Sequence, residues 1–293
     1  MLLLQAMLDG LSIGASFALL AAGVAIISSV LRFVSFSFGG QVVFVAFIIT
    51  SLADSLPLWV ALVAGVLAGV AISLLTIPIA FSRAASLPPS TLVMLSFALG
   101  LGLQSVLVMV FGDSPRPFPA PEWAAQTLSI GDARISLISL TTIAIAVVVL
   151  TGMGLVLNRT RVGVAIRGAA EDAEVAQMLG VKPRIIVAAA FAISGAISAV
   201  VAYLWFAKAG SVMPRVGLDL SLSAFIAVVV GGVTSLRGSV VGGVLLGLAA
   251  SLLTTLLPGD ASGYARVFLF VLVIVLLLVR PQGLLGSAWK ESR

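Results

Sequence analysis

The stretch "MLLLQAMLDGLSIGASFALLAAGVAIISSVLR" (1–32) has one acidic residue and no basic residue before its last position. A secretory signal peptide begins with basic residues and has a shorter apolar run, so we interpret this stretch as a retained membrane span. The whole chain has the same character. Hydrophobic residues make up 61% and charged residues 9% of its 293 residues, against about 45–50% and about 25% in soluble domains. We therefore predict an integral membrane protein.

Eight or nine transmembrane helices are predicted, in one all-α, polytopic permease-like domain over residues 1–293. A span needs about 20 mostly apolar residues. Nine stretches are candidates: 8–30, 34–53, 58–80, 91–111, 135–157, 185–207, 218–236, 239–257 and 264–280. The second and the seventh are short and rich in Ser or Gly, so either could be broken or re-entrant.

The distribution of Lys and Arg predicts the orientation. If the 158–184 loop is cytoplasmic, alternating spans place 11 basic and 4 acidic residues on that side, and 5 basic and 7 acidic residues on the other. Cytoplasmic loops carry an excess of Lys and Arg. We therefore expect the N-terminus outside and the C-terminus in the cytoplasm. One span more or fewer would invert the N-terminal half.

Several classes of chemistry are absent from the chain. It contains no Cys and no His, which excludes disulfides and a thiol nucleophile and removes the commonest general base and metal ligand. The segment "GGVTSLRGS" (231–239) lacks the Lys of a Walker A motif, as does the rest of the chain. We expect no enzymatic activity, no metal and no cofactor in this chain.

Uncharged polar and glycine residues occur within the predicted spans, which hold almost no ionisable residue. Close helix packing is one explanation for each of them. The functional alternative is a weakly polar path for a small neutral or zwitterionic solute. The candidate residues for this path are Ser35, Ser37, Gly39, Gly40, Gln41, Gln104, Gly231, Gly232 and Thr234. The lack of buried acids disfavours proton coupling, whereas sodium coupling or a channel stays open.

Two further features stand out along the chain. The loop 112–134 holds four prolines, which predicts an irregular, stiff segment that is either a connector or an external docking surface. The stretch 55–76 resembles 235–254, and the predicted topology gives the two opposite directions. Inverted repeats are typical of transporters, although chance similarity between apolar spans is an equal alternative.

The segment "RGAAEDAEVAQMLGVKPR" (167–184) is a polar interruption between apolar runs. Its Ala, Glu, Gln, Met and Leu residues favour a helix, with Gly180 and Pro183 as stop signals. We predict a helix of roughly three turns over 168–180. A stripe of small residues along one side would let another surface come close, although a solvated surface helix is the alternative.

This part of the chain resembles the branched-chain amino acid type ABC permeases. The residues "TRVGVAIRGAAEDAEVAQMLGV" (160–181) are similar to the cytoplasmic loop of that family, and "AFIAVVVGGVTSLRGSVVGGVLLG" (224–247) and "VRPQGLLG" (279–286) to later segments. The element "SFSFGGQ" (35–41) departs from the family, because the family's His and Glu are replaced. This departure puts a typical branched-chain amino acid substrate in question.

The resemblance implies the membrane-spanning permease of an ATP-driven importer for small amino acids or related polar metabolites, in a bacterial inner membrane. Implied partners are a second, homologous permease, two cytoplasmic ATPases that bind ATP and Mg, and an extracytoplasmic solute-binding protein. The predicted helix would be the coupling helix. Its implied ATPase contacts are Arg167, Ala169, Glu171, Asp172, Ala173, Ala176, Leu179 and Gly180. The alternative is a secondary transporter or facilitator that works alone.

Overall fold

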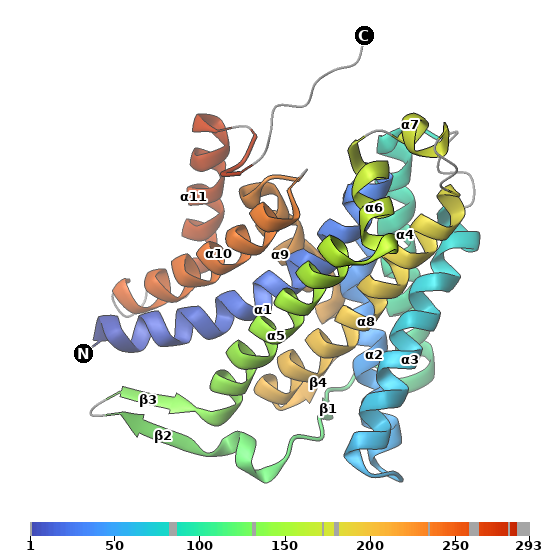
Figure 1. Cartoon of the computed structure of the whole chain (residues 1–293). Helices are drawn as coiled ribbons and strands as arrows, with labels where there is room; N and C mark the ends of the chain where they lie inside the picture. The colour runs from blue at the N-terminus through green and yellow to red at the C-terminus, as the bar shows by residue number, and fades with distance from the viewer. Residues whose placement is uncertain are drawn as a thin grey trace.

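The part of the protein that the structure describes is a bundle of helices with four short strands at its edge (Figure 1). The computed structural model describes residues 2–81, 87–130, 133–171, 173–178, 182–233, 235–257, 264–280 and 282–285. Its α-helices are α1 Leu2–Leu31, α2 Ser37–Ala53, α3 Leu58–Thr76, α4 Pro89–Phe111, α5 Leu137–Arg159, α6 Arg161–Glu171, α7 Ala173–Met178, α8 Pro183–Ala209, α9 Val216–Gly231, α10 Leu236–Leu256 and α11 Ala265–Val279. A π-helical turn, η1 (Ile77–Phe81), continues α3, and η3 (Glu122–Ala125) is a 3-10 turn.

Each of the nine predicted spans corresponds to a helix, which confirms the helical membrane fold. Within the described residues, six helices are long and apolar enough to cross a membrane, namely α1, α3, α4, α5, α8 and α10. The apolar helices α2, α9 and α11 have 17, 16 and 15 residues. The second and seventh predicted spans, α2 and α9, are therefore continuous but short. The number of complete crossings stays a prediction.

Local sequence signals explain several helix ends. The hydroxyl oxygens of Ser136 and Ser235 accept hydrogen bonds from backbone N–H groups in the first turns of α5 and α10. Pro89 and Pro183 occupy the first positions of α4 and α8, where a helix needs no N–H donor. Gly210 ends α8 with a φ of +73°, a conformation that favours glycine.

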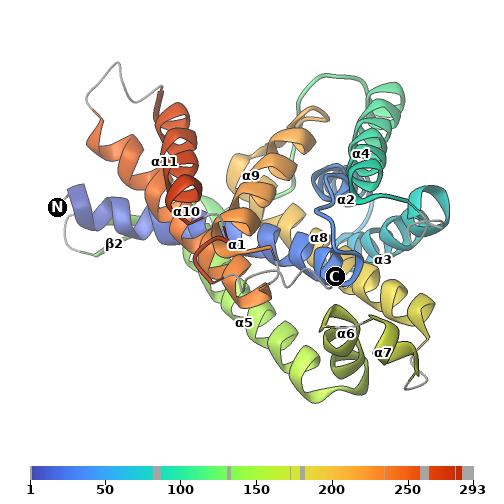
Figure 2. The ribbon, with the colours of Figure 1, turned by 90° about the horizontal axis from the view of Figure 1, so that it is seen from above.

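The packing supports the inverted repeat. Helix α1 lies along α10, and α8 lies along α3; α2 contacts α3, α8 and α9, and α9 correspondingly contacts α10, α1 and α2. If α1, α2 and α3 are matched with α8, α9 and α10 in that order, each of these contacts has an equivalent contact in the other segment. Seen from above, α1 runs through the middle of the molecule, with α10 and α11 on one side and α3 and α4 on the other (Figure 2).

The contacts also give the directions of the helices. The hydroxyl of Ser194 in α8 donates to the carbonyl of Gly23 in α1 at 2.8 Å. Nearer the start of α1, Phe17 stacks on Trp205 near the end of α8, so α1 and α8 are antiparallel. Helix α3 is antiparallel to α8, because Gly69 packs against Gly195 while Ser73 bonds to the carbonyl of Phe191. Helix α10 is antiparallel to α1, as the glycine contacts along that pair require. Consequently α3 and α10 run in opposite directions, as the sequence comparison of 55–76 with 235–254 predicts.

The prediction of an irregular 112–134 loop was wrong in part. Strands β2 (Thr127–Ile130) and β3 (Ala133–Ser136) pair as an antiparallel hairpin. Strand β1 (Arg116–Pro117) pairs with β4 (Ser211–Val212), which follows α8. Asp113 and Arg215 form an ion pair at 2.6 Å beside this pairing of strands. The Asp113 carboxylate raises the pKa of Arg215, mainly by accepting its hydrogen bond and in addition by its negative charge. The loop is therefore tied to the α8–α9 connection.

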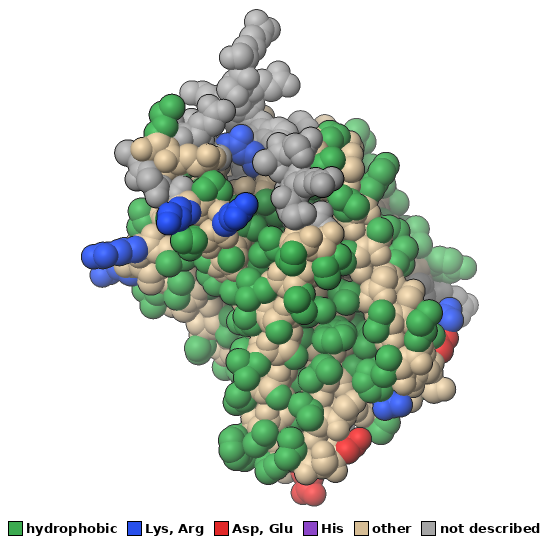
Figure 3. All heavy atoms as spheres, turned by 90° about the vertical axis from the view of Figure 1, so that its right-hand side faces the viewer, with side chains coloured by type: hydrophobic (Ala, Val, Ile, Leu, Met, Phe, Trp, Pro, Cys, Tyr) green, Lys and Arg blue, Asp and Glu red, His purple; other side chains and the backbone are tan. Residues whose placement is uncertain are grey.

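Charged side chains are separated along the molecule. In the view of Figure 3, most Lys and Arg atoms gather toward the end that carries α6, and the Asp and Glu atoms lie toward the other end. Hydrophobic side chains cover the surface between the ends. Large apolar side chains are exposed on α3, α4, α5 and α11, as a surface in contact with lipid requires.

Candidate translocation site

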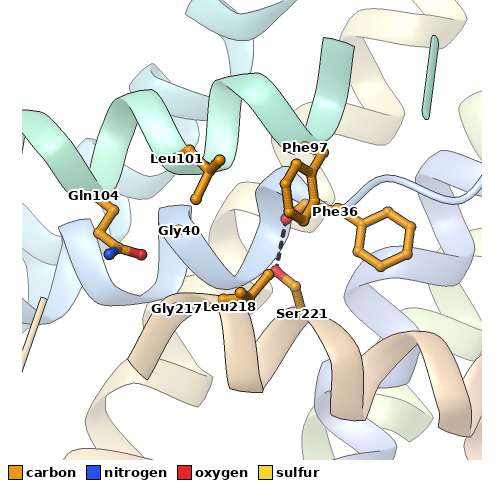
Figure 4. Close-up of a pocket in the computed structure, with 9 residues that line it drawn as sticks. Phe36, Gly40, Phe97, Leu101, Gln104, Gly217, Leu218 and Ser221 are labelled. Atoms are coloured by element: carbon orange, nitrogen blue, oxygen red, sulfur yellow. Dashed lines mark hydrogen bonds between the residues drawn. The ribbon is translucent and has the colours of Figure 1, made fainter. Parts of the chain in front are cut away.

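A small hollow lies between α2, α4 and α9, at the middle of α4 (Figure 4). Its lining comes from the start of α2 (Phe36, Gly40), from α4 (Phe97, Gly100, Leu101, Gln104) and from the start of α9 (Gly217, Leu218, Ser221). None of these nine residues is ionisable. The free space has room for only about one water molecule, so the site is narrow in this conformation.

The start of α2 is held by a residue of another helix. Its N-cap position, Phe36, provides no side-chain cap. Instead the N–H of Gly39 donates to the hydroxyl oxygen of Ser221 in α9 at 3.0 Å, and this hydroxyl donates to the Phe36 carbonyl at 2.6 Å. Ser221 therefore satisfies one of the free N–H groups that begin every helix. Next to it, the hydroxyls of Ser35 and Ser37 bond to each other at 2.9 Å.

Glycines bring the three helices close together. A Cβ at Gly39 would collide with the carbonyl oxygen of Gly217 and with Ser221. A Cβ at Gly40 would lie 3.1 Å from the carbonyl oxygen of Gly100 in α4. These glycines thus allow close helix packing, as the packing explanation in the sequence analysis expects. Gly40, Gly100 and Gly217 also line the hollow, while Gly39 lies beside it.

Gln41 is fully buried, and both polar atoms of its side chain lack a hydrogen-bond partner among the described residues. Gln41 does not line the hollow. It lies one helical turn before Val45, which faces Gly65 of α3. The side chain therefore belongs to the α2–α3 face, and an unpaired buried amide is energetically costly.

The predicted path residues divide into two groups. Gly40 and Gln104 line the hollow, while Ser35, Ser37, Gly39 and Gln41 lie beside it on or next to the first turns of α2. Gly231 and Gly232 do not join them. They end α9, about 20 Å from Gly217 at 1.5 Å per residue, and Gly231 packs against Gly238 and Gly242 of α10. Thr234 lies outside the described residues.

The predicted coupling segment is helical but begins earlier than expected. Helix α6 starts at Arg161 rather than at 168, because Thr160 accepts a hydrogen bond from the N–H of Gly163 at 3.1 Å and so caps it. A short second helix, α7, follows. Asp172, Leu179 and Gly180 lie outside the described residues, and of Glu171 and Ala173 only the backbone is described. Pro183, predicted as a stop signal, is the first residue of α8.

Two of the small residues of this segment, Ala169 and Ala176, face the protein itself. Ala176 is buried and Ala169 is half-buried against the hydrophobic core. The exposed positions are Arg167, Gly168, Gln177 and Met178, the last with 85% of its surface exposed. The α6 and α7 sides that carry Ala169 and Ala176 therefore pack inward, and the contacts of this segment with a partner stay a prediction.

Of the lining residues, sequence reasoning missed Phe36, Phe97, Leu101, Gly217, Leu218 and Ser221. Several of them are apolar residues in apolar spans and carry no signal of their own. Ser221 is a polar residue within an apolar span, as are the predicted path residues, and a search for such residues should have included it.

A profile of the family described as branched-chain amino acid transport system / permease component matches residues 6–279. The chain is 31% identical to the high-affinity branched-chain amino acid transport system permease protein BraD of Pseudomonas aeruginosa, over 99% of this chain and 97% of BraD. It is 26% identical to LivH, the corresponding permease protein of Escherichia coli K12, over 99% of this chain and 97% of LivH.

A partial match extends to another solute. The fructose import permease protein FruF of Bifidobacterium longum is 30% identical over 47% of this chain and 40% of FruF. Similar sequences therefore occur in import permeases whose names give chemically different substrates.

Proposed function

Since this chain belongs to the family of branched-chain amino acid transport system permease components, and is the membrane permease subunit of an ABC importer, we propose that it carries a small amino acid without net charge, or a related polar metabolite. The hollow between α2, α4 and α9 is the central part of the path. The observation that carries the proposal is the chemistry of its lining, in which a Gln amide and a Ser hydroxyl stand among apolar and glycine residues without any charge.

The lining fits such a solute in two ways. Phe36, Phe97 and Leu101 offer apolar contacts to a hydrocarbon side chain, while Gln104 offers both a donor and an acceptor. A solute with net charge would enter without a counter-charge, which is costly away from water. Branched-chain amino acids meet these conditions. The replacement of the family's His and Glu in 35–41, and the similarity to a fructose permease, keep other neutral polar solutes in the proposal.

Uptake by the complete importer tests the proposal. The tagged chain is purified from its own cells with its bound subunits and reconstituted into vesicles, with the co-purified solute-binding protein outside. We expect ATP-dependent uptake of leucine, valine or another neutral solute. The variant Gln104→Glu, which adds a charge to the lining, should reduce this uptake by tenfold or more. Gln282→Glu, at an exposed position after α11 and outside both the hollow and α6–α7, serves as control. Normal uptake by Gln104→Glu would contradict a path through this hollow.

We also propose the partners and the orientation. The segment α6–α7 docks on a cytoplasmic ATPase. The importer holds two such ATPases, and each binds ATP and Mg. A second, homologous permease lies beside this chain, and a solute-binding protein contacts the end opposite α6. The N-terminus is outside and the C-terminus is cytoplasmic. The excess of Lys and Arg at the α6 end supports this arrangement. Uptake by the chain alone, driven by an ion gradient, would instead favour a secondary transporter.

A further inference from the structure

The segment between α1 and α2 folds back into the protein instead of continuing a helix. Arg32, directly after α1, has a φ of +56°, an unusual conformation for a residue with a side chain. Phe33, Val34 and Ser35 are buried. Phe36, the last residue of the link, reaches the hollow. Strained backbone at such a link has to be stabilised by the residues around it.

Two serines from different helices hold the main chain of Phe36. Its N–H donates to the hydroxyl oxygen of Ser96 in α4 at 3.1 Å, and its carbonyl accepts from Ser221 in α9. The Ser96 hydroxyl donates to the carbonyl of Val93. Each serine hydroxyl thus donates one hydrogen bond and accepts another, so both are satisfied without water as long as Phe36 stays in place.

The ring of Phe36 is held by two further rings. It lies 6.2 Å from the ring of Phe97 in an edge arrangement and 5.1 Å from the ring of Phe225. Phe36 and Phe97 therefore lie at one end of the hollow and Gln104 lies at its other end (Figure 4). Phe225 of α9, outside the lining, packs against the ring of Phe36.

The aromatic end faces the end of the molecule that carries α6. Along α4, Phe97 is closer to the first residue, Pro89, and Gln104 is closer to the last, Phe111. Beyond Phe111, Asp113 pairs with Arg215 at the far end of the protein. The start of α4 follows α3, whose last turns contact the first half of α8, next to α6 and α7. The three rings thus lie between the hollow and the α6 end.

We propose that Phe36 is a gate residue, closed in this structure, which separates the hollow from the α6 end of the protein, and that Ser96 and Ser221 are positioning residues that keep it closed. This proposal rests on the proposed function only in taking the hollow as part of the translocation path. It opens when α2 moves relative to α4 and α9, which exchanges both serine bonds for bonds to water or solute. While it is closed, the room for one water excludes an amino acid.

The absence of cysteine from the sequence allows a direct test. A single cysteine at Gln104, in the intact complex in membrane vesicles, is exposed to a membrane-impermeant thiol reagent on one face at a time. The face on which a cysteine at exposed Gln282 reacts defines the α6 side, because this residue lies beside the end of α9, whose start adjoins Arg215 at the far end. We expect slow reaction of Gln104→Cys from that side. Adding Ser221→Ala should raise the rate about three- to tenfold, the population shift that loss of about one net hydrogen bond produces. Phe36→Ala, which keeps both backbone hydrogen bonds but removes the ring that closes the gate, should also raise it.

Ser251→Ala is the matched control. Ser251 is 3% exposed, as Ser221 is, and its hydroxyl donates across helices to the carbonyl of Ala6 at 2.7 Å. This substitution should leave the rate unchanged, and the rate at Gln282→Cys should stay the same in every variant that folds. The gate is refuted if Ser221→Ala and Phe36→Ala leave the rate unchanged, accelerate reaction equally from both faces, or act no more strongly than Ser251→Ala. Thiol reactivity needs no knowledge of the substrate, so failure of the proposed function would leave this result intact.

Discussion

The glycine at position 39 shows how a single missing side chain sets the distance between two helices. The first turn of α2 meets the first turn of α9 with backbone against backbone, since Gly39 and Gly217 leave no side chain between them. This closeness puts Ser221 within reach of two backbone groups of the α2 start. In a membrane, such contacts between small residues contribute much of the association between helices.

Gly39→Ala should therefore destabilise the protein by about 1–3 kcal/mol, the usual range for an overpacked interior site. Thermal unfolding in detergent, followed by loss of the monodisperse peak, measures the effect. Gly102→Ala is the control, because a Cβ there meets nothing within 4 Å and alanine favours the helix. Equal stability of the two variants would mean that α2 and α9 are not in close contact.

For Gln41 we predict a substitution that does not lower the stability of the protein. Its buried amide is unpaired among the described residues, so replacing it with an apolar side chain of similar size removes a desolvation cost. We expect Gln41→Leu to unfold at the same or a higher temperature than the native protein, whereas Gln41→Ala, which leaves a cavity, should unfold at a lower temperature. A clear loss of stability in Gln41→Leu would indicate that the amide is hydrogen-bonded to water in the native protein.

At the scale of elements, α6 and α7 combine an anchored side with an exposed side. Ile166 is buried, and α6 packs against α1, α5 and α8. The exposed side carries Arg167, Gly168 and Met178. Motion of this element would therefore reach α1 directly, and the link that carries Phe36 begins where α1 ends. This arrangement is a physical route by which an ATPase at α6 could act on the hollow.

Gly168→Trp tests the docking of α6. A Cβ at Gly168 meets nothing within 4 Å, so the fold should tolerate the large side chain, while a partner seated there should not. We expect loss of co-purified ATPase and at least a tenfold fall in ATP-driven uptake. Gly152→Trp on α5 is the control, since this glycine is equally open but lies within a predicted membrane span. Retention of the ATPase by Gly168→Trp would place the docking surface elsewhere.

Much of the whole molecule can be predicted from its sequence, because long apolar runs dominate the signal. The nine spans correspond to helices, and the repeat between 55–76 and 235–254 corresponds to α3 and α10. Contacts between distant positions carry no such signal. The bond between Ser221 and Phe36 joins positions 185 residues apart, and β1 has two residues whose partner strand follows α8. The site was therefore only partly predicted, through Gly40 and Gln104.

The whole-molecule charge distribution leads to a prediction of orientation. Basic residues at the α6 end should stay in the cytoplasm, since translocating them across the membrane is unfavourable. Because the chain has no cysteine, a single introduced cysteine reports on which side of the membrane its position lies. We expect Ser55→Cys and Met213→Cys, both exposed at the end opposite α6, to react with an impermeant thiol reagent in intact spheroplasts. Gln282→Cys, exposed at the α6 end but outside α6–α7, should react only after the membrane is opened. The reverse pattern would place α6 outside, where no ATPase could reach it, and the coupling assignment would fail together with the orientation.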